Sequence, residues 1–305
     1  MTEESSLDGH LPELVFGLLC LAWGAAPVAI RFGLRFFPPF FFGGIRFLIA
    51  WSLVTAYALA TRTEFPRDGA TWRVMLFLSL SQTALPMTLI FWAQQYVIAG
   101  LSSVLYATMP FFVAIFAHFF ASGERLSGRN LLGMLLSFAG VVMLFSGELS
   151  VDRYSFLGGL ALVVAAAASG CGMAAGKKYS SSINTTANIT VQMGVGALIL
   201  TTAGILFESN APLDFNLASI VTILYLVVIG SLLGFAAMYW LFRHMEATRV
   251  SLLSFITPIV AIVLGWLILG EQVDLNAIVS SSLIILGLMV SKQAGQRHLL
   301  RITPT

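Results

Sequence analysis

The feature that most constrains this chain is a series of ten apolar runs, which together fill almost its whole length. A helix needs about 20 apolar residues to cross a hydrocarbon core about 30 Å thick. The runs are too long for strands, and a segment in lipid must satisfy its own backbone hydrogen bonds, so helices are the expected spanning form. The runs cover residues 12–33, 39–61, 71–95, 101–121, 128–147, 155–176, 185–207, 217–242, 249–269 and 275–293. We therefore predict an all-α membrane protein with ten transmembrane helices.

The composition agrees with this architecture, because 58% of the residues are hydrophobic and only 10% are charged. A soluble domain carries about 25% charged residues. The two cysteines, Cys20 and Cys171, lie within apolar runs, so no disulfide framework is expected. The N-terminal residues are acidic where a signal peptide is basic, so the first run is expected to be a retained helix.

Loop charges predict the orientation, because Lys and Arg near helix ends favour the cytoplasmic side. With the N-terminus inside, twelve of the 16 basic residues fall in cytoplasmic loops or in the C-terminal tail. Only Arg31, Arg35 and Arg153 fall in outer loops, and Arg46 lies within the second run. We expect a multi-pass protein of the inner (cytoplasmic) membrane with both termini cytoplasmic.

The chain also contains an internal repeat. The matched pairs are Phe91–Trp92 with Tyr239–Trp240 and Met109–Pro110 with Thr257–Pro258 at an offset of 148 residues, Gly123–Glu124 with Gly270–Glu271 and Gly140 with Gly287 at 147, and Trp23–Gly24 with Ser169–Gly170 and Arg46 with Gln192 at 146. Each half holds five predicted helices, an odd number, so the second half must enter the membrane upside down. We therefore predict two inverted five-helix repeats, residues 1–148 and 149–305, the second with a short cytoplasmic tail. Inverted repeats are a recurrent transporter design.

The segment from Trp92 to Phe112, WAQQYVIAGLSSVLYATMPFF, resembles the EamA family of the drug/metabolite transporter superfamily. The segment Gly123-Glu-Arg-Leu126, leading into Gly133 and Ala139-Gly-Val141, is also similar to this family. The resemblance covers nearly the whole chain as two EamA-type repeats. It implies a ten-helix carrier, commonly an exporter of amino acids or similar metabolites, with a cavity lined by helices 1, 3, 4, 6, 8 and 9.

Polar and aromatic residues inside the predicted helices are candidates for the substrate cavity, because polar groups in hydrocarbon are costly unless satisfied. Tryptophan faces can also stack against planar or cationic ligand groups. Each candidate has a structural alternative, since Ser and Thr often bond their own helix and buried tryptophans often only pack. The candidates are Trp23, Gln82, Thr88, Trp92, Gln94, Tyr106, Tyr239, Trp240, Ser254 and Thr257. Trp92 and Trp240, which are repeat-related, are also candidate gates near opposite membrane faces.

Two further sets of residues bear on movement and packing. A proline inside a helix removes a backbone hydrogen bond and favours a kink, which is either a hinge or a fixed bend. Small residues on one helix face let helices approach closely in lipid, and we expect them to pack the two halves together. The candidate hinges are Pro86, Pro110 and Pro258, and the packing residues are Gly133, Gly140, Ser280 and Gly287.

Charged residues inside the runs limit the substrate. Arg46 either binds a substrate carboxylate or braces the bundle, and the bracing role is favoured because its repeat mate Gln192 is uncharged. His118 is expected to be a satisfied interfacial histidine. No Asp or Glu lies in the middle of a run, whereas proton-coupled exporters of organic cations generally need a buried carboxylate. We therefore predict a neutral or zwitterionic substrate.

The sequence thus predicts a secondary transporter that exports a small metabolite by alternating access. An uptake permease with the same fold is the first alternative, and an intramembrane enzyme or a structural subunit is a remote one. No nucleotide-binding, zinc-protease or Cys-x-x-Cys motif is visible, so we expect no enzymatic activity, no catalytic residue, no cofactor and no metal. The expected partners are the small-molecule substrate and membrane lipid, with no nucleic acid, and the expected state is a monomer or homodimer.

Overall fold

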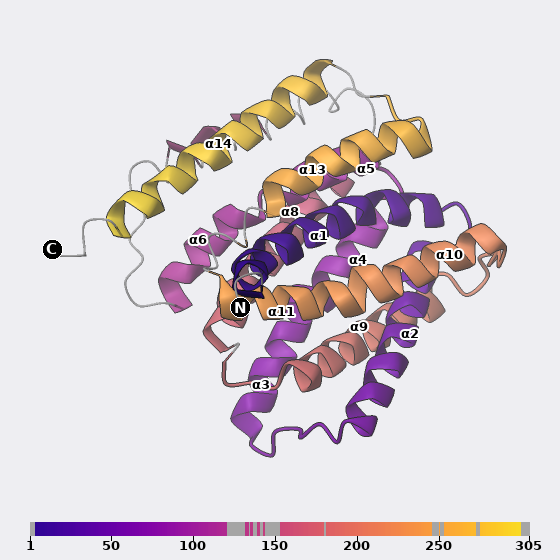
Figure 1. Ribbon diagram of the computed structural model, residues 1–305. Helices are drawn as coiled ribbons and strands as arrows, with labels where there is room; N and C mark the ends of the chain where they lie inside the picture. Colours follow the sequence, from indigo (N-terminus) through magenta and orange to yellow (C-terminus); the bar gives the residue numbers. More distant parts are fainter. Residues whose placement is uncertain are drawn as a thin grey trace, which may run out of the picture.

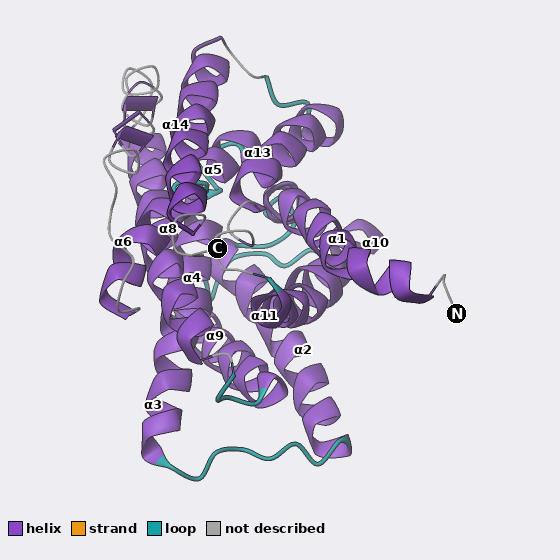
Figure 2. Ribbon diagram, turned by 60° about the vertical axis from the view of Figure 1, so that its left-hand side comes forward, coloured by secondary structure: helices purple, strands orange, loops and turns teal. Residues whose placement is uncertain are grey.

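The computed structural model describes residues 4–120, 153–179, 181–245, 250, 253–272 and 275–299, together with 132, 133, 135, 136, 139, 140 and 143. These residues form helices and short connections, and no strand occurs among them (Figure 2). The first helices are α1 (Glu4–Gly33), α2 (Pro39–Ala60), α3 (Gly69–Leu78), the π-helix η1 (Ser79–Ala84), α4 (Leu85–Ala93), α5 (Ala99–Tyr106) and α6 (Met109–Phe120). They are followed by α8 (Arg153–Tyr179), α9 (Thr185–Phe207), α10 (Leu217–Tyr225), the π-helix η2 (Leu226–Leu233), α11 (Gly234–His244), α13 (Leu253–Leu264), the π-helix η3 (Gly265–Leu269) and α14 (Leu275–Leu299).

Six helical segments are long and apolar enough to cross a membrane. They are Leu11–Gly33, Pro39–Ala60, Gly69–Ala93, Arg153–Tyr179, Thr185–Phe207 and Leu217–His244. Shorter apolar helices cover Ala99–Val113, Ile256–Leu269 and Ile278–Gly287. The protein is therefore a multi-pass helical membrane protein.

Two of the segments that cross the membrane contain a π-helix at an equivalent place. η1 joins α3 to α4, and η2 joins α10 to α11, about 148 residues further along the chain. Pro86 follows η1 within the continuous helical segment Gly69–Ala93, so it lies inside a membrane-crossing helix. A π-helix widens the helix locally and leaves some carbonyl groups with altered partners, and such segments are frequent at functional sites.

The expected single helix over 101–121 is wrong in detail, because the structure breaks it. α5 ends at Tyr106, and α6 begins at Met109. Pro110 therefore lies in the first turn of α6. It had been expected in the interior of a helix, where a proline can act as a hinge. A backbone N–H in the first turn would have no partner within the helix, so a proline, which lacks this N–H, is readily accommodated there. Pro258, its repeat mate, does lie inside α13.

The packing of the described helices divides most of them into two groups. In the α8 group, α8 packs along α4, η1 and α6, and in the α1 group, α1 packs along α11, α10, η2 and α13. α5 lies between α8, α13 and α1, and α2 packs closely along α9. The first helix of each sequence half therefore packs mainly against helices of the other half.

Two close helix contacts have the same spacing as the sequence repeat. A Cβ atom on Gly24 of α1 would lie 2.6 Å from Val260 Cβ in α13. A Cβ atom on Gly170 of α8 would lie 2.6 Å from Phe112 Cβ in α6. The two glycines are 146 residues apart and their contacts 148 residues apart, which are the repeat offsets. α1 thus meets α13 in the same way as α8 meets α6.

Figure 1 and Figure 2 both show α14 at the margin of the bundle. A Cβ atom on Gly140 would lie 2.7 Å from Ile284 Cγ1 and 2.9 Å from the carbonyl oxygen of Ser280, both in α14. Gly133, Ser280 and Gly287 are also buried. Gly140 therefore packs directly against a helix from the other end of the sequence.

We expect Gly140→Leu to lower the yield of folded protein strongly, and Gly133→Leu to lower it as well. A leucine at position 140 would overlap the backbone of α14, and overpacking of this kind costs about 1–3 kcal/mol or more. Size-exclusion profiles and thermal unfolding in detergent would measure the effect. Ala139→Leu is the matched control, because Ala139 is exposed. A normal yield and normal thermal stability of Gly140→Leu would contradict the packing role.

Candidate functional site

A cavity of about 150 Å³ lies between the two helix groups. Its wall is formed by residues from both halves of the sequence, and most of the wall is apolar. The polar and aromatic residues in the wall are Trp23, Arg46, Gln82, Gln94, Ser102, Ser103, Tyr106, Ser169, Phe235 and Thr257. A cavity of about 150 Å³ holds a molecule of about the size of benzene, so a larger ligand requires the helix groups to separate.

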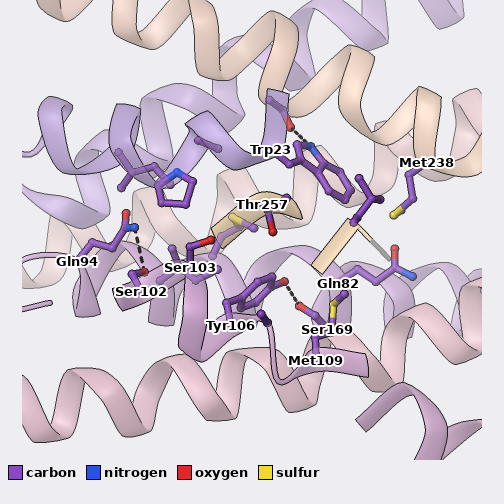
Figure 3. Close-up of a pocket in the computed structure, with 18 of the residues that line it drawn as sticks. Trp23, Gln82, Gln94, Ser102, Ser103, Tyr106, Met109, Ser169, Met238 and Thr257 are labelled. Atoms are coloured by element: carbon purple, nitrogen blue, oxygen red, sulfur yellow. Dashed lines mark hydrogen bonds between the residues drawn. The ribbon is translucent and has the colours of Figure 1, made fainter. Parts of the chain in front are cut away.

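Hydrogen bonds hold several of these side chains in place (Figure 3). Tyr106 Oη donates to Ser169 Oγ at 2.6 Å, which joins α5 to α8. Gln94 Nε2 donates to Ser102 Oγ at 3.0 Å. The other amide atom, Gln94 Oε1, is buried and has no hydrogen-bond partner in the protein. An unpaired buried acceptor costs free energy.

Trp23 reaches from α1 to η2. Its indole Nε1 donates to the carbonyl oxygen of Gly230 at 3.2 Å, and its ring packs edge-on against Phe235 at 6.0 Å between centroids. The close approach depends on Gly234, where a Cβ atom would collide with the indole. The π-helix and its glycines therefore place the Trp23 ring in the cavity wall.

Arg46 is a buried cation in the same wall, with 3% of its surface exposed. Its Nε donates to Ser231 Oγ at 3.0 Å. Its guanidinium carbon lies 5.1 Å from the Phe47 ring centroid and 6.0 Å from the Phe91 ring centroid. The bond to Ser231 is a bracing contact. However, no carboxylate is present among the described residues that line the cavity, so an anionic group in the cavity would face an uncompensated positive charge.

A hydrogen-bonded network lies beside the cavity and includes two predicted residues. Tyr239 Oη donates to Gln82 Oε1 at 2.8 Å, and Gln192 Nε2 donates to Tyr239 Oη at 2.6 Å. Thr83 Oγ1 in turn donates to Gln192 Oε1 at 2.9 Å. This network fixes the orientation of Gln82, whose side chain is in the cavity wall, while Tyr239 lines a separate small cavity.

The network and the Arg46 contact are equivalent under the sequence repeat. Arg46 and Gln192 are 146 residues apart, and their partners Thr83 and Ser231 are 148 residues apart. The same pair of positions therefore forms a hydrogen bond in each half, Arg46 with Ser231 and Gln192 with Thr83. Gln192 is uncharged and makes the bracing hydrogen bond. Arg46 makes the equivalent bond and also brings a positive charge to the cavity wall.

Two basic side chains, Arg31 and Lys177, each bind the C-terminal end of a neighbouring helix. Arg31, in the last turn of α1, donates through Nη1 to the carbonyl oxygens of Gln94 and Gln95, the latter at 2.7 Å. Lys177, in the last turn of α8, donates through Nζ to the carbonyl oxygens of Phe242 at 2.6 Å and Met245 at 3.4 Å. Cations near helix C-termini interact favourably with the last carbonyls and with the helix dipole.

Glu271 binds the N-terminal end of a helix, α5. Its two carboxylate oxygens accept from the backbone N–H groups of Ala99 at 2.8 Å and Gly100 at 3.3 Å, at the start of α5. The preceding Gly270 has a φ of 68°, a left-handed conformation that favours glycine and turns the chain at this point. Its sequence equivalent, Gly123–Glu124, lies outside the described residues.

The structure brings five of the ten predicted cavity residues into the wall. These five are Trp23, Gln82, Gln94, Tyr106 and Thr257. Thr88, Trp92 and Trp240 do not line this cavity, and their role at a substrate site or as gates stays a prediction. Tyr239 lies one hydrogen bond away, behind Gln82. The side chains of Ser254 and of His118 lie outside the described part of the chain.

Thr88, Trp92 and Trp240 each contact another residue outside the cavity wall. Thr88 Oγ1 donates to the carbonyl oxygen of Ala84 in its own helix at 2.7 Å. Trp92 packs edge-on against Tyr96, and Trp240 stacks on His244 at 3.9 Å between centroids. Trp92 and Trp240 both lie near the C-terminal ends of their helices. Among the wall residues that sequence reasoning missed, Ser169 had a usable signal, since it aligns with Trp23 in the repeat.

Comparison with known proteins agrees with this arrangement. Residues 11–146 and again 156–292 match the model of the EamA-like transporter family. The uncharacterized transporter YoaV of Bacillus subtilis is 25% identical over 272 residues, which cover 89% of this chain and 93% of that protein. A probable amino-acid metabolite efflux pump of Escherichia coli is 26% identical over 298 residues, with 94% and 95% covered. The uncharacterized inner membrane transporter YedA of Escherichia coli is 25% identical over 258 residues, with 84% and 82% covered.

A solved structure described as "Crystal structure of protein" has the same fold. Its TM-score is 0.68 at 18% sequence identity, and the alignment covers 94% of this chain and 98% of that chain.

Proposed function

The chain belongs to the EamA-like transporter family, and from this premise we propose that it exports a small neutral or zwitterionic metabolite across the inner membrane by alternating access. The observation that carries the proposal is the central cavity, which lies between helices of both sequence halves. Its wall is mainly apolar and holds one cation, several hydroxyl and amide groups and, among its described residues, no carboxylate.

For the architecture, we propose ten transmembrane helices in two inverted repeats, residues 1–148 and 149–305. The six long apolar segments, the shorter apolar helices and the two matches to the family model support it. The equivalent contacts of Gly24 and Gly170, and of Arg46 and Gln192, also support it, because they follow the repeat offsets. The distribution of basic residues favours cytoplasmic termini.

For the substrate, the cavity chemistry suits a zwitterion with a carboxylate. Arg46 supplies a positive charge for the carboxylate, and Gln94 Oε1 supplies a buried acceptor for an ammonium or amide group. This assignment revises the sequence-based preference for a purely bracing Arg46. The name of the Escherichia coli relative, a probable amino-acid metabolite efflux pump, points to the same class of compound.

Counterflow into proteoliposomes tests this function. We expect saturable exchange of at least one labelled zwitterionic metabolite from a panel of amino acids, and no transport of a quaternary ammonium dye above that of empty liposomes. Tyr106→Ala should reduce the exchange, because Tyr106 joins α5 to α8 in the wall, whereas Trp92→Ala should leave it nearly intact. Strong transport of the quaternary ammonium dye, or loss of exchange in Trp92→Ala alone, would contradict the assignment.

Direction is tested separately. Export predicts that cells expressing the protein resist a toxic analogue of the substrate, whereas an uptake permease makes them accumulate it and become more sensitive.

A further inference from the structure

We propose that Arg31 and Lys177 form a pair of latches that decide which end of the cavity opens. The Arg31 latch is the contact of Arg31 with the carbonyl oxygens of Gln94 and Gln95. The Lys177 latch is the contact of Lys177 with the carbonyl oxygens of Phe242 and Met245. The proposal rests on alternating access as the mode of transport.

The two latches are equivalent under the sequence repeat. Lys177 follows Arg31 by 146 residues, and Phe242 follows Gln94 by 148 residues. These are the offsets that also relate the contacts of Gly24 to those of Gly170. In each half, therefore, a basic residue at the end of the first membrane-crossing helix binds carbonyl oxygens at the C-terminal end of the third. Neither residue was singled out by sequence reasoning, because a basic residue at a helix end is ordinary.

Both latches join the two helix groups. Arg31 belongs to α1 and binds the chain that directly follows α4, which is part of the α8 group. Lys177 belongs to α8 and binds the end of α11, which is part of the α1 group. Each contact therefore crosses between the groups that form the cavity, and it must break when the groups separate at that end.

The latches lie at opposite ends of the cavity. A Cβ atom on Gly158 of α8 would lie 3.3 Å from the carbonyl oxygen of Ala93, so Gly158 is level with the Arg31 latch. Lys177 is 19 residues further along the same helix, a distance of about 28 Å at 1.5 Å per residue. That distance is close to the thickness of the hydrocarbon core.

In alternating access, one end opens while the other stays closed. Opening the Arg31 end breaks the Arg31 latch and keeps the Lys177 latch, and opening the Lys177 end does the reverse. Removing Arg31 therefore favours the state that is open at the Arg31 end, and removing Lys177 favours the state that is open at the Lys177 end. The loss of one such charged contact shifts the ratio of the two open states by about fivefold to thirtyfold.

Labelling of a cysteine in the cavity tests the proposal. Cys20 and Cys171 are replaced by alanine, and Ser103→Cys, in the cavity wall, supplies the reporter. A membrane-impermeant maleimide is then applied to right-side-out and to inside-out vesicles. We expect Arg31→Ala to change the ratio of labelling from the two sides by about fivefold to thirtyfold, and Lys177→Ala to change it by a similar factor in the opposite direction.

Neighbouring basic residues provide the controls. Arg35→Ala and Lys178→Ala should leave the ratio unchanged, because both side chains are exposed and lie near the latches without joining the helix groups. Arg31→Lys and Lys177→Arg should restore most of the original ratio, because they keep a cation that can reach the carbonyls. Arg31→Gln and Lys177→Gln remove the charge but keep a polar side chain, and they replace the alanine variants if those fold poorly.

The outcomes separate this proposal from the proposed function. Shifts of equal sign in the two latch variants, or no shift relative to Arg35→Ala and Lys178→Ala, would overturn the latches. The readout does not depend on knowing the substrate, so a failed search for substrates leaves it valid. Labelling that comes from one side only in every variant would instead overturn alternating access itself.

Discussion

Arg46→Met is expected to abolish transport of a zwitterionic substrate while leaving the protein folded. The half-saturation concentration should rise by about a hundredfold or more, because an unpaired buried carboxylate costs about 3 kcal/mol or more. The fold should tolerate the change, since replacing a buried charge by an apolar side chain of similar volume is often neutral or stabilising. Counterflow in proteoliposomes and thermal unfolding in detergent measure the two effects.

The controls separate ligand binding from bracing at this position. Ser231→Ala removes the bracing partner of Arg46 and should change the half-saturation concentration little. Arg46→Lys keeps a charge and should retain part of the activity, and Arg73→Met removes an exposed charge and should have no effect. Equal losses of transport in Ser231→Ala and Arg46→Met would show that Arg46 acts only as a brace.

Gly24→Leu and Gly170→Leu are each expected to prevent folding in the membrane. A side chain at either position would enter the space of a neighbouring helix, within 3.2 Å of the Thr257 carbonyl oxygen for Gly24 and 2.9 Å of the Val113 amide nitrogen for Gly170. Because backbone atoms cannot move aside as a flexible side chain can, we expect a loss of about 3 kcal/mol or more. Yields of monodisperse protein would show this loss.

Gly17→Leu is the matched control on the same helix. A Cβ atom on Gly17 has no atom within 4 Å, and residue 17 lies seven residues before Gly24 on about the same helix face. Normal yield is expected for Gly17→Leu. Similar losses in Gly17→Leu and Gly24→Leu would mean that any large residue on α1 is disruptive, and the equivalence of the two helix contacts would lose its support.

The six long spans follow directly from hydropathy, because lipid imposes both length and apolarity on a crossing helix. The interruptions do not follow from it. The break between Tyr106 and Met109 lies in a stretch that is apolar throughout, and η1 and η2 leave no mark in hydropathy. Both features depend on how neighbouring helices and their carbonyl groups are satisfied, which only the packed bundle decides.

The π-helices limit what the sequence can say about which residues face the cavity. A residue in a helix is displaced by about 100° from the one before it. An extra residue in a π-helical turn therefore rotates every later residue relative to a regular helix. Thr88, Trp92 and Gln94 all follow η1, and of these three only Gln94 lines the cavity. Residue type and depth, which singled out these side chains, therefore do not decide which of them face the cavity.

For Arg46 the difficulty was different. The repeat showed that its mate is the uncharged Gln192, which favoured a structural role. In the structure both residues do form equivalent bracing bonds. A repeat can thus reveal the role that two positions share, but it is silent about an additional role of one copy.

Arg31 and Lys177 hold equivalent places with cations of different chemistry. A guanidinium presents several donors in a rigid fork and reaches the carbonyls of two consecutive residues, whereas an ammonium is a compact, strongly hydrated charge. Glu271 reinforces the Arg31 end by binding the start of α5. In the absence of ligand, the ratio of the two open states should therefore follow the difference in strength between the contacts at the two ends. Such a bias supplies no driving force, since only a gradient does so, but it makes the apparent affinities on the two sides of the membrane unequal.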